Sequence, residues 1–293
     1  MNPDLMTKAF NSLLSRSLPE GGFIGRIQGS YRPDATAWAV LALEVWGYKG
    51  SILQASRDRL AAEQRPDGRV CLSPAHEDVF WPTSLAILAW QSSAPHSQPK
   101  TRAVEFLLKA SGKHWPRRPN DAAAHDTALR GWSWTGDTHS WTEPTALAIL
   151  ALKAASFSEH ERVQEAEKML IDRQLPSGGW NYGNTLVFAQ ELRPMPESTG
   201  LALDALSGSV PRQQVEQSLQ YLKARITNLK TPRSLAWSLL GLGAWGERPK
   251  SASEYVAACL TRSGGYGDYD TPSLALLMLA FSANRGLLSI FKD

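Results

Sequence analysis

The chain is poor in cysteine and carries little net charge. Only 2 of its 293 residues are cysteine, and Cys71 and Cys259 stand too far apart to suggest a framework of disulfides. Lys plus Arg number 31 against 28 for Asp plus Glu, an excess too small for a surface that binds nucleic acid. We therefore expect a cytoplasmic protein with no nucleic-acid partner.

Long apolar runs are absent as well. The longest, Leu235–Trp245 and Leu274–Phe281, fall well short of the ~20 residues that a membrane-spanning helix needs. The first sixteen residues include Asp4, Lys8 and Arg16, whereas a secretory signal has an apolar core. These features exclude a spanning segment but leave open contact with the surface of a membrane.

Tryptophan, in contrast, is abundant, with 11 in the chain. A buried Trp contributes a large ring and needs a partner for its indole N–H. So many of them predict a repeated structural role, an aromatic-lined cavity, or both.

One helix pattern recurs six times. Each copy has a turn, a small or hydroxyl residue, then Leu or Trp followed by Ala and an aliphatic run, as in Pro144-Thr-Ala-Leu-Ala-Ile-Leu-Ala-Leu152. A helix that is apolar on nearly every side is buried on every side. The copies align on six alanines, which are Ala39, Ala86, Ala148, Ala202, Ala236 and Ala275.

The segments between these copies mix polar and apolar residues at helical spacing, which predicts surface helices with one buried stripe. They are Ile52–Gln64, Thr101–Ala110, His160–Gln174, Val215–Ala224 and Ser253–Thr261. Buried inner helices that alternate with amphipathic outer helices predict an all-α fold, the α/α toroid or α6/α6 barrel of six helical hairpins. We expect residues 1–293 to form it as a single domain, with Gly112–Ala128 as an insertion on its surface.

A second motif recurs where outer helices end. Gln174-Leu-Pro-Ser-Gly-Gly-Trp180 is the best copy and Gln64-Arg-Pro-Asp-Gly-Arg-Val70 a partial one. Glycine permits the left-handed residue that stops a helix, and the aromatic ring packs across the turn. The motif resembles the Gln-x-x-x-Gly-x-Trp repeat of the squalene-hopene and oxidosqualene cyclases, which prenyltransferase β subunits share more loosely. The resemblance runs from Leu18 to Phe281 and implies a terpenoid cyclase-like toroid.

In a toroid the inner helices run parallel, so their N-termini surround one opening. The residues five positions before the aligned alanines form a column around that opening, and they are Asp34, Trp81, Glu143, Glu197, Thr231 and Asp270. Acids at this position also cap helices. We expect Glu143 and Glu197 to cap their helices and also to line the cavity.

The resemblance also implies chemistry. Class II terpene cyclases protonate an alkene or epoxide with the middle Asp of an Asp-x-Asp-Asp-Thr-Ala motif. Here Asp270 takes the position of that proton donor and Asp268 that of the first acid, while Thr271 stands where the third acid would be. We therefore expect Asp270 to donate the proton, supported by Asp268, with Asp34 as the second match.

Carbocations formed in such a reaction need aromatic faces. Trp38, Trp81, Trp90 and Trp237 lie on the expected inner helices or at their start and can supply those faces. The candidates for a hydrogen bond to the anion that the acid leaves behind are Tyr269, Tyr266 and His139, and the sequence does not choose among them. The expected enzyme is an isomerase-type cyclase that takes a hydrophobic linear isoprenoid and needs no cofactor.

Two other functions stay open. The toroid could bind a lipid or a protein without catalysis, or it could transfer a prenyl group, for which Arg233 at the start of an inner helix is one diphosphate contact. Zinc, which prenyltransferase β subunits bind, is not expected, because Asp67, Cys71 and His76 lack their ligand spacing. A deep apolar cavity with one acid at its top would favour the cyclase, and a ring filled by side chains would favour the binding protein. Nothing in the sequence indicates an oligomeric state.

Overall fold

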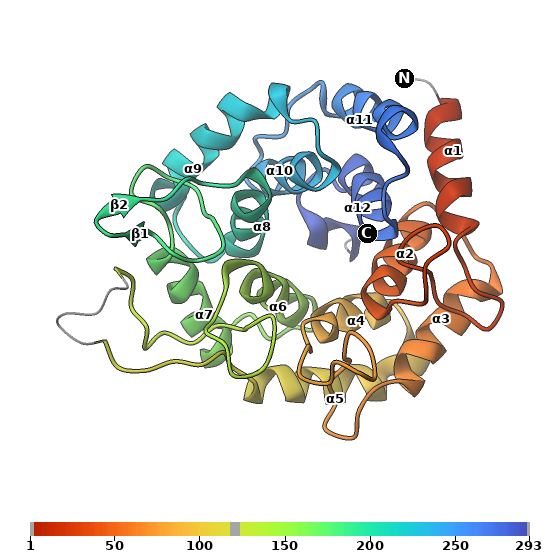
Figure 1. Ribbon diagram of the computed structural model, residues 1–293, viewed down its shortest axis with the longest axis horizontal. Helices are drawn as coiled ribbons and strands as arrows, with labels where there is room; N and C mark the ends of the chain where they lie inside the picture. The colour runs from red at the N-terminus through yellow and green to blue at the C-terminus, as the bar shows by residue number, and fades with distance from the viewer. Residues whose placement is uncertain (1–2, 118–123, 292–293) are drawn as a thin grey trace.

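The computed structural model describes residues 3–117 and 124–291, which fold into twelve α-helices arranged as a double ring (Figure 1). The inner helices are α2 (Pro33–Val45), α4 (Pro82–Trp90), α6 (Thr142–Ala154), α8 (Pro196–Leu206), α10 (Pro232–Ala244) and α12 (Thr271–Ser282). The outer helices are α1 (Pro3–Leu14), α3 (Ser51–Ala62), α5 (Ser97–Lys109), α7 (Glu161–Asp172), α9 (Arg212–Arg225) and α11 (Ala252–Tyr266). The predicted toroid of six helical hairpins is confirmed.

Burial explains the composition of the two rings. Each inner helix packs against the next, and α12 packs against α2 to close the ring. Every residue of α4 is buried, because one side of the helix faces the centre and the others face neighbouring helices. An outer helix such as α7 buries only a stripe that includes Val163, Ala166 and Leu170.

A threonine near the start of four inner helices ties each helix to the turn before it. The Oγ1 of Thr145 accepts the N–H of Trp132 at 2.9 Å and donates to the carbonyl of the same residue at 3.2 Å. In each of the other three, the threonine Oγ1 accepts a backbone N–H at 2.9 Å, and the pairs are Thr36 with Phe23, Thr83 with Val70, and Thr199 with Trp180. The aromatic or aliphatic residue that ends the turn motif therefore positions the start of an inner helix.

The glycines of the motif are required twice over. Gly68 has φ +98° and Gly178 has φ +91°, a region that side chains rarely adopt. A Cβ on Gly68 would also lie 2.1 Å from the carbonyl oxygen of Arg102 on α5, and one on Gly178 would lie 2.7 Å from the carbonyl carbon of Gln217 on α9. The motif thus ends one outer helix and lets its turn touch the next.

The segment after α1 joins the first repeat to the last. Arg16 is 3% exposed and donates from Nη1 to the carbonyl of Tyr269 at 2.7 Å. Thr271 donates its N–H to the carbonyl of Gly25 at 2.9 Å and its hydroxyl to the carbonyl of Ile24 at 2.6 Å. These contacts close the ring between α12 and α2.

The C-terminal segment covers the end of the ring at which inner helix α8 finishes. The 3-10 helix η3 (Leu287–Phe291) contacts α6 and α12 and lies inside the ring in Figure 1. Leu287 is fully buried and donates its N–H to Oδ2 of Asp204, on α8, at 2.8 Å. Burial raises the pKa of Asp204 to about 7. The buried Asp204 of α8 therefore anchors the segment that covers this end.

Smaller elements complete the described chain. They are the 3-10 helices η1 (Ala94–His96) and η2 (Ile226–Asn228) and a hairpin of β1 (Leu186–Val187) and β2 (Gln190–Glu191). Part of the expected insertion, residues 118–123, lies outside the described residues. None of the helices in the described chain has both the length and the apolar character that crossing a bilayer requires.

Candidate functional site

The N-terminal ends of the inner helices surround a pocket of about 260 Å³, called the central pocket below. The first turns of α2, α6, α10 and α12 all reach it, so these helices run in the same direction. The lining residues are Arg32, Asp34, Trp38, Trp81, Trp134, Glu143, Leu147, Leu201, Arg233, Trp237, Pro272 and Leu276.

Indole rings form much of the surface of the central pocket. Trp38 of α2 and Trp237 of α10 meet edge to face with their ring centroids 5.9 Å apart. Trp81 and Trp134 meet in the same way at 5.3 Å. Farther along the inner helices the side chains are buried, as Leu41 is with 1% of its surface exposed. The site is therefore an aromatic cup at one end of a packed core.

Glu143 places a carboxyl group in this cup. It lies in the first turn of α6 and is partly buried. Burial raises the pKa of Glu143, while the hydrogen bond from the Ser198 hydroxyl, at 2.9 Å, and the charge of Arg233 lower it. The carboxyl keeps its proton to higher pH than an exposed glutamate, and the groups that would stabilise its anion are already beside it.

Asp34 lines the same pocket, but as half of an ion pair. It is 2% exposed, and its Oδ1 and Oδ2 accept from Nε and Nη2 of Arg32 at 2.8 and 2.9 Å. A bidentate, charge-assisted contact of this kind fixes the orientation of both side chains. The geometry suits Asp34 to holding Arg32 at the mouth of the pocket.

Asp270 lies at the rim, outside the central pocket. It is the N-cap of α12, and its Oδ1 accepts the N–H of Ser273 at 2.8 Å. Its surroundings form a neighbouring rim pocket of about 340 Å³, which Arg26, Arg32 and Arg233 also line.

Asp268 and Tyr269 lie in yet another pocket, one that residues of α1 and α11 line. The hydroxyl of Tyr269 donates to the carbonyl of Cys259, on α11, at 2.8 Å. The structure therefore does not bring Asp268 and Asp270 to one cavity. The cap on α12 holds Asp270 at the rim, while the contact with α11 holds Tyr269 at the outside.

Glu197 is not among the residues that line the central pocket. Its Oε2 accepts from the hydroxyl of Ser234 at 2.6 Å, just as Glu143 accepts from Ser198. In both cases a serine of the next inner helix binds the acid. Trp134, which does line the pocket, was not expected there. It follows the turn residue Trp132 by two positions, a spacing that the turn motif does not include.

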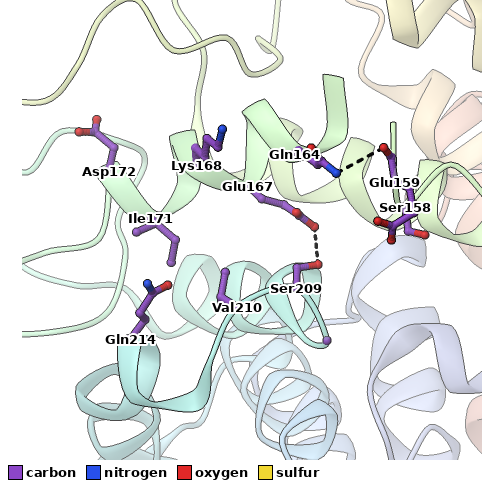
Figure 2. Close-up of a pocket in the computed structure, with 11 residues that line it drawn as sticks. Ser158, Glu159, Gln164, Glu167, Lys168, Ile171, Asp172, Ser209, Val210 and Gln214 are labelled. Atoms are coloured by element: carbon purple, nitrogen blue, oxygen red, sulfur yellow. Dashed lines mark hydrogen bonds between the residues drawn. The ribbon is translucent and has the colours of Figure 1, made fainter. Parts of the chain in front are cut away.

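A wider groove of about 600 Å³ lies outside the ring, between α7 and the loop from α8 to α9 (Figure 2). Its apolar surface comes from Ile171 and Val210, and most other lining groups are charged or polar. Glu167 accepts from the Ser209 hydroxyl at 2.5 Å and pairs with Lys153 at 3.0 Å. This groove is a polar outer face and does not suit an isoprenoid.

Solved structures with the same architecture include several terpene cyclases. The type II terpene cyclase MstE from Scytonema, in complex with geranylgeranyl dihydroxybenzoate as substrate, superposes with a TM-score of 0.60 at 14% identity, over 98% of this chain and 97% of that one. A protein from Actinoplanes gives a TM-score of 0.60 at 16% identity, over 96% and 98%. The ent-copalyl diphosphate synthase of Streptomyces platensis gives 0.54 at 16% identity, over 88% and 50%.

In sequence, the lanosterol synthase of Aspergillus fumigatus is 27% identical over 175 residues, which cover 54% of this chain and 22% of that protein. The chain thus matches about a fifth of the length of this curated relative. No family model matches it. The chain has the terpenoid cyclase-like toroid fold that its turn motif predicted.

Proposed function

We propose that this chain is a terpene cyclase-like enzyme that starts the cyclisation of a linear isoprenoid by protonating it. The observation that carries the proposal is the Glu143 carboxyl, whose pKa burial raises, set in a cup of four indole rings. A reaction that begins with proton transfer to a carbon–carbon double bond needs both an acid that is protonated at rest and surfaces that tolerate positive charge.

In the proposed step, the O–H bond of Glu143 breaks as a C–H bond forms at one alkene carbon, which leaves a carbocation and a carboxylate. The Ser198 hydroxyl, Arg233 and the N-terminal end of α6 stabilise the carboxylate. The indole rings that line the pocket, Trp81 and Trp134 among them, offer aromatic surfaces for the cation. Ring closure moves the positive charge along the chain. The reaction ends when a C–H bond beside the final cation breaks, its electron pair forms an alkene and its proton passes to water, and water returns a proton to the Glu143 carboxylate.

The sequence-based choice of Asp270, with Asp268 and Asp34, stays a competing proposal for the same step. Support for Glu143 over these three comes from their contacts. Asp34 holds Arg32, Asp270 caps α12, and Asp268 is exposed in a different pocket.

The size of the central pocket limits the substrate. Its volume of about 260 Å³ lies slightly below the roughly 300–1,000 Å³ found for small-molecule sites. We propose a short isoprenoid, or the terminal prenyl units of a longer chain that extends past the arginines of the rim.

The test is incubation with linear isoprenoids of increasing length, followed by chromatography and mass spectrometry of the products. We expect a cyclic isomer of the substrate from the wild type, Asp268→Asn and Asp270→Asn, and at least about 100-fold less of it from Glu143→Gln. Cyclic product at the wild-type level from Glu143→Gln together with its loss in Asp270→Asn would move the acid to Asp270.

The alternative is a toroid that binds a lipid without turning it over, which the packed interior beyond the cup favours. In the same experiment, an isoprenoid that raises the melting temperature but gives no product would support this alternative. A prenyltransferase of the zinc type receives no support, because the described residues include no group of three or more His, Cys, Asp and Glu side chains placed to hold a metal.

We further propose that the toroid rests on a membrane through the β1–β2 hairpin. Phe188, at its turn, is 95% exposed and Val187 is 39% exposed, and an exposed aromatic on a protruding turn can bury its ring among lipids. We expect Phe188→Ser to weaken sedimentation with phosphatidylcholine vesicles about tenfold, while Phe188→Trp keeps it. Equal sedimentation of the wild type and Phe188→Ser would argue against this contact.

A further inference from the structure

A second cavity, of about 200 Å³, lies where the insertion folds back on the ring, and we call it the histidine pocket. It shares no lining residue with the central pocket. Its walls come from the insertion, the loop before α6, the end of α7 and the loop after it. The lining residues are Lys113, Trp115, His125, Thr127, Leu129, His139, Ser140, Arg173 and Asn184.

Backbone hydrogen bonds hold these walls together. Lys113 donates its N–H to the carbonyl of Thr138 at 2.7 Å, and Trp115 donates to that of Thr127 at 3.0 Å. On the other side, Arg173 donates from Nη1 to the carbonyl of Gly183 at 2.9 Å. The cavity is therefore a built part of the fold. One contact lies within the insertion, one joins the insertion to the loop before α6, and one joins the end of α7 to the loop after it.

Several polar atoms around the pocket lack a hydrogen-bond partner within the described residues. They include Nδ1 of His125, which is 7% exposed, Nε2 of His139, and Nε of Arg173, which is 2% exposed. The nearest acid to Arg173 is Asp172 at 3.5 Å, and that carboxylate also accepts the N–H of Asp126. Unpartnered buried polar atoms are rare and costly. The two imidazole nitrogens, beside an Arg173 Nε whose one acidic partner lies as far as 3.5 Å away, therefore point to a bound group. The cavity is also several times larger than the ~30 Å³ that one water takes up.

The charges around the pocket decide what kind of group fits. Burial and the charges of Arg173, His139 and Arg117 lower the pKa of His125 to about 4, while the charge of Asp126 opposes that shift. Burial and Arg173 lower the pKa of His139 as well. Both rings are therefore neutral near pH 7 and each carries one N–H, beside a guanidinium and with the exposed Lys113 at the rim. Asp126 and Asp172 lie outside the lining, and the lining itself carries two cationic groups and two N–H donors, which suit an anion.

We propose that the histidine pocket binds a small oxyanion of the carboxylate or phosphate type, held by Arg173, Lys113 and the two imidazoles. The insertion makes this repeat longer than the others, and its contribution to the site is His125 and Lys113. The proposal is independent of the reaction at the central pocket.

The test is calorimetric titration of the intact protein with inorganic phosphate and, separately, with acetate, while proton NMR follows the imidazole signals. We expect saturable binding of one of the two anions, with shifts in the His125 and His139 signals. Lys113→Ala, an exposed change that leaves the fold intact, is expected to weaken binding about tenfold, as the loss of one charge-assisted contact does. Lys109→Ala, on the exposed end of α5, is the matched control and should bind like the wild type.

Arg173→Lys tests the buried contact, and circular dichroism checks that this variant folds. Binding that weakens in Lys113→Ala and moves the two histidine signals supports the proposal. No saturable binding of either anion, or binding that is the same in Lys113→Ala and the wild type, would overturn it whatever the fate of the Arg173 variant.

Discussion

Replacing Glu143 with glutamine is expected to reduce the rate of isoprenoid cyclisation by about 100-fold to 10,000-fold, the usual contribution of a positioned acid. Glutamine keeps the shape of the side chain and still accepts from the Ser198 hydroxyl, but it has no acidic proton to donate. The packing of the cup should therefore survive while the first step fails. The measurement is kcat/KM from product formation, with circular dichroism to compare the folds.

The pH dependence gives the same hypothesis a second test. Since burial raises the pKa of Glu143, its protonated, active form persists to higher pH than that of an exposed glutamate. We expect kcat/KM to be constant below this pKa and to fall tenfold per pH unit above it. Any residual kcat/KM of Glu143→Gln should not fall with pH in this way.

Glu197→Gln is the matched control for Glu143. Glu197 occupies the same position one inner helix farther on and accepts from Ser234 in the same way, but it does not line the central pocket. We expect this variant to keep the rate of the wild type at low pH. Its decline should begin at a lower pH, because the charge of Glu197 is one of the causes that raise the pKa of Glu143. A loss as large as that of Glu143→Gln would show that the acid ring matters as a whole and would remove the special role of Glu143.

The second large effect concerns stability. Asp204→Asn is expected to remove a pH-dependent penalty of up to about 4 kcal/mol, because the pKa of this buried acid rises from 3.8 to about 7 on folding and each unit corresponds to about 1.36 kcal/mol. The folded state holds the proton more tightly than the unfolded state, so this group lowers the free energy of unfolding as the pH rises from about 4 to about 7. Above pH 7 the penalty is complete.

Urea unfolding of the wild type and Asp204→Asn across pH 4 to 8 measures the difference. As the pH rises, we expect the free energy of unfolding of Asp204→Asn to increase relative to that of the wild type. This trend should hold even if the buried amide costs some stability at every pH. Asp137→Asn, on an exposed loop, should follow the wild type. Parallel pH curves for the wild type and Asp204→Asn would contradict a raised pKa at this position.

Much of the fold could be predicted because it repeats. The six alanine-centred segments are apolar on every side, and only a helix enclosed by others can bury such a surface. All six are inner helices in the structure. Five outer helices were predicted from their apolar residues at helical spacing, whereas the sixth, α1, was not. The contacts of α1 with α11 and α12 come from opposite ends of the chain, and the ring closure that creates them has no local signal.

The candidate site was predictable only in part. The alignment placed Asp34, Glu143, Glu197 and Asp270 at the starts of inner helices, where the structure has them. It did not distinguish their surroundings. Asp34 meets an arginine two residues away, and Asp270 caps its own helix. Glu143 meets Ser198 from α8 and the charge of Arg233 from α10.

By itself, then, the amino-acid order determined the periodic features, which are the alternation of buried and amphipathic helices, the glycine turns, and the ring of acids at one end. These follow from side-chain polarity and backbone freedom within a few residues. Which acid faces the indole cup, and which cavity the insertion encloses, was decided only when distant helices packed together. The ionisation of a carboxyl depends on the burial, hydrogen bonds and charges around it, and for Glu143 those neighbours come from segments that only the closed ring brings together.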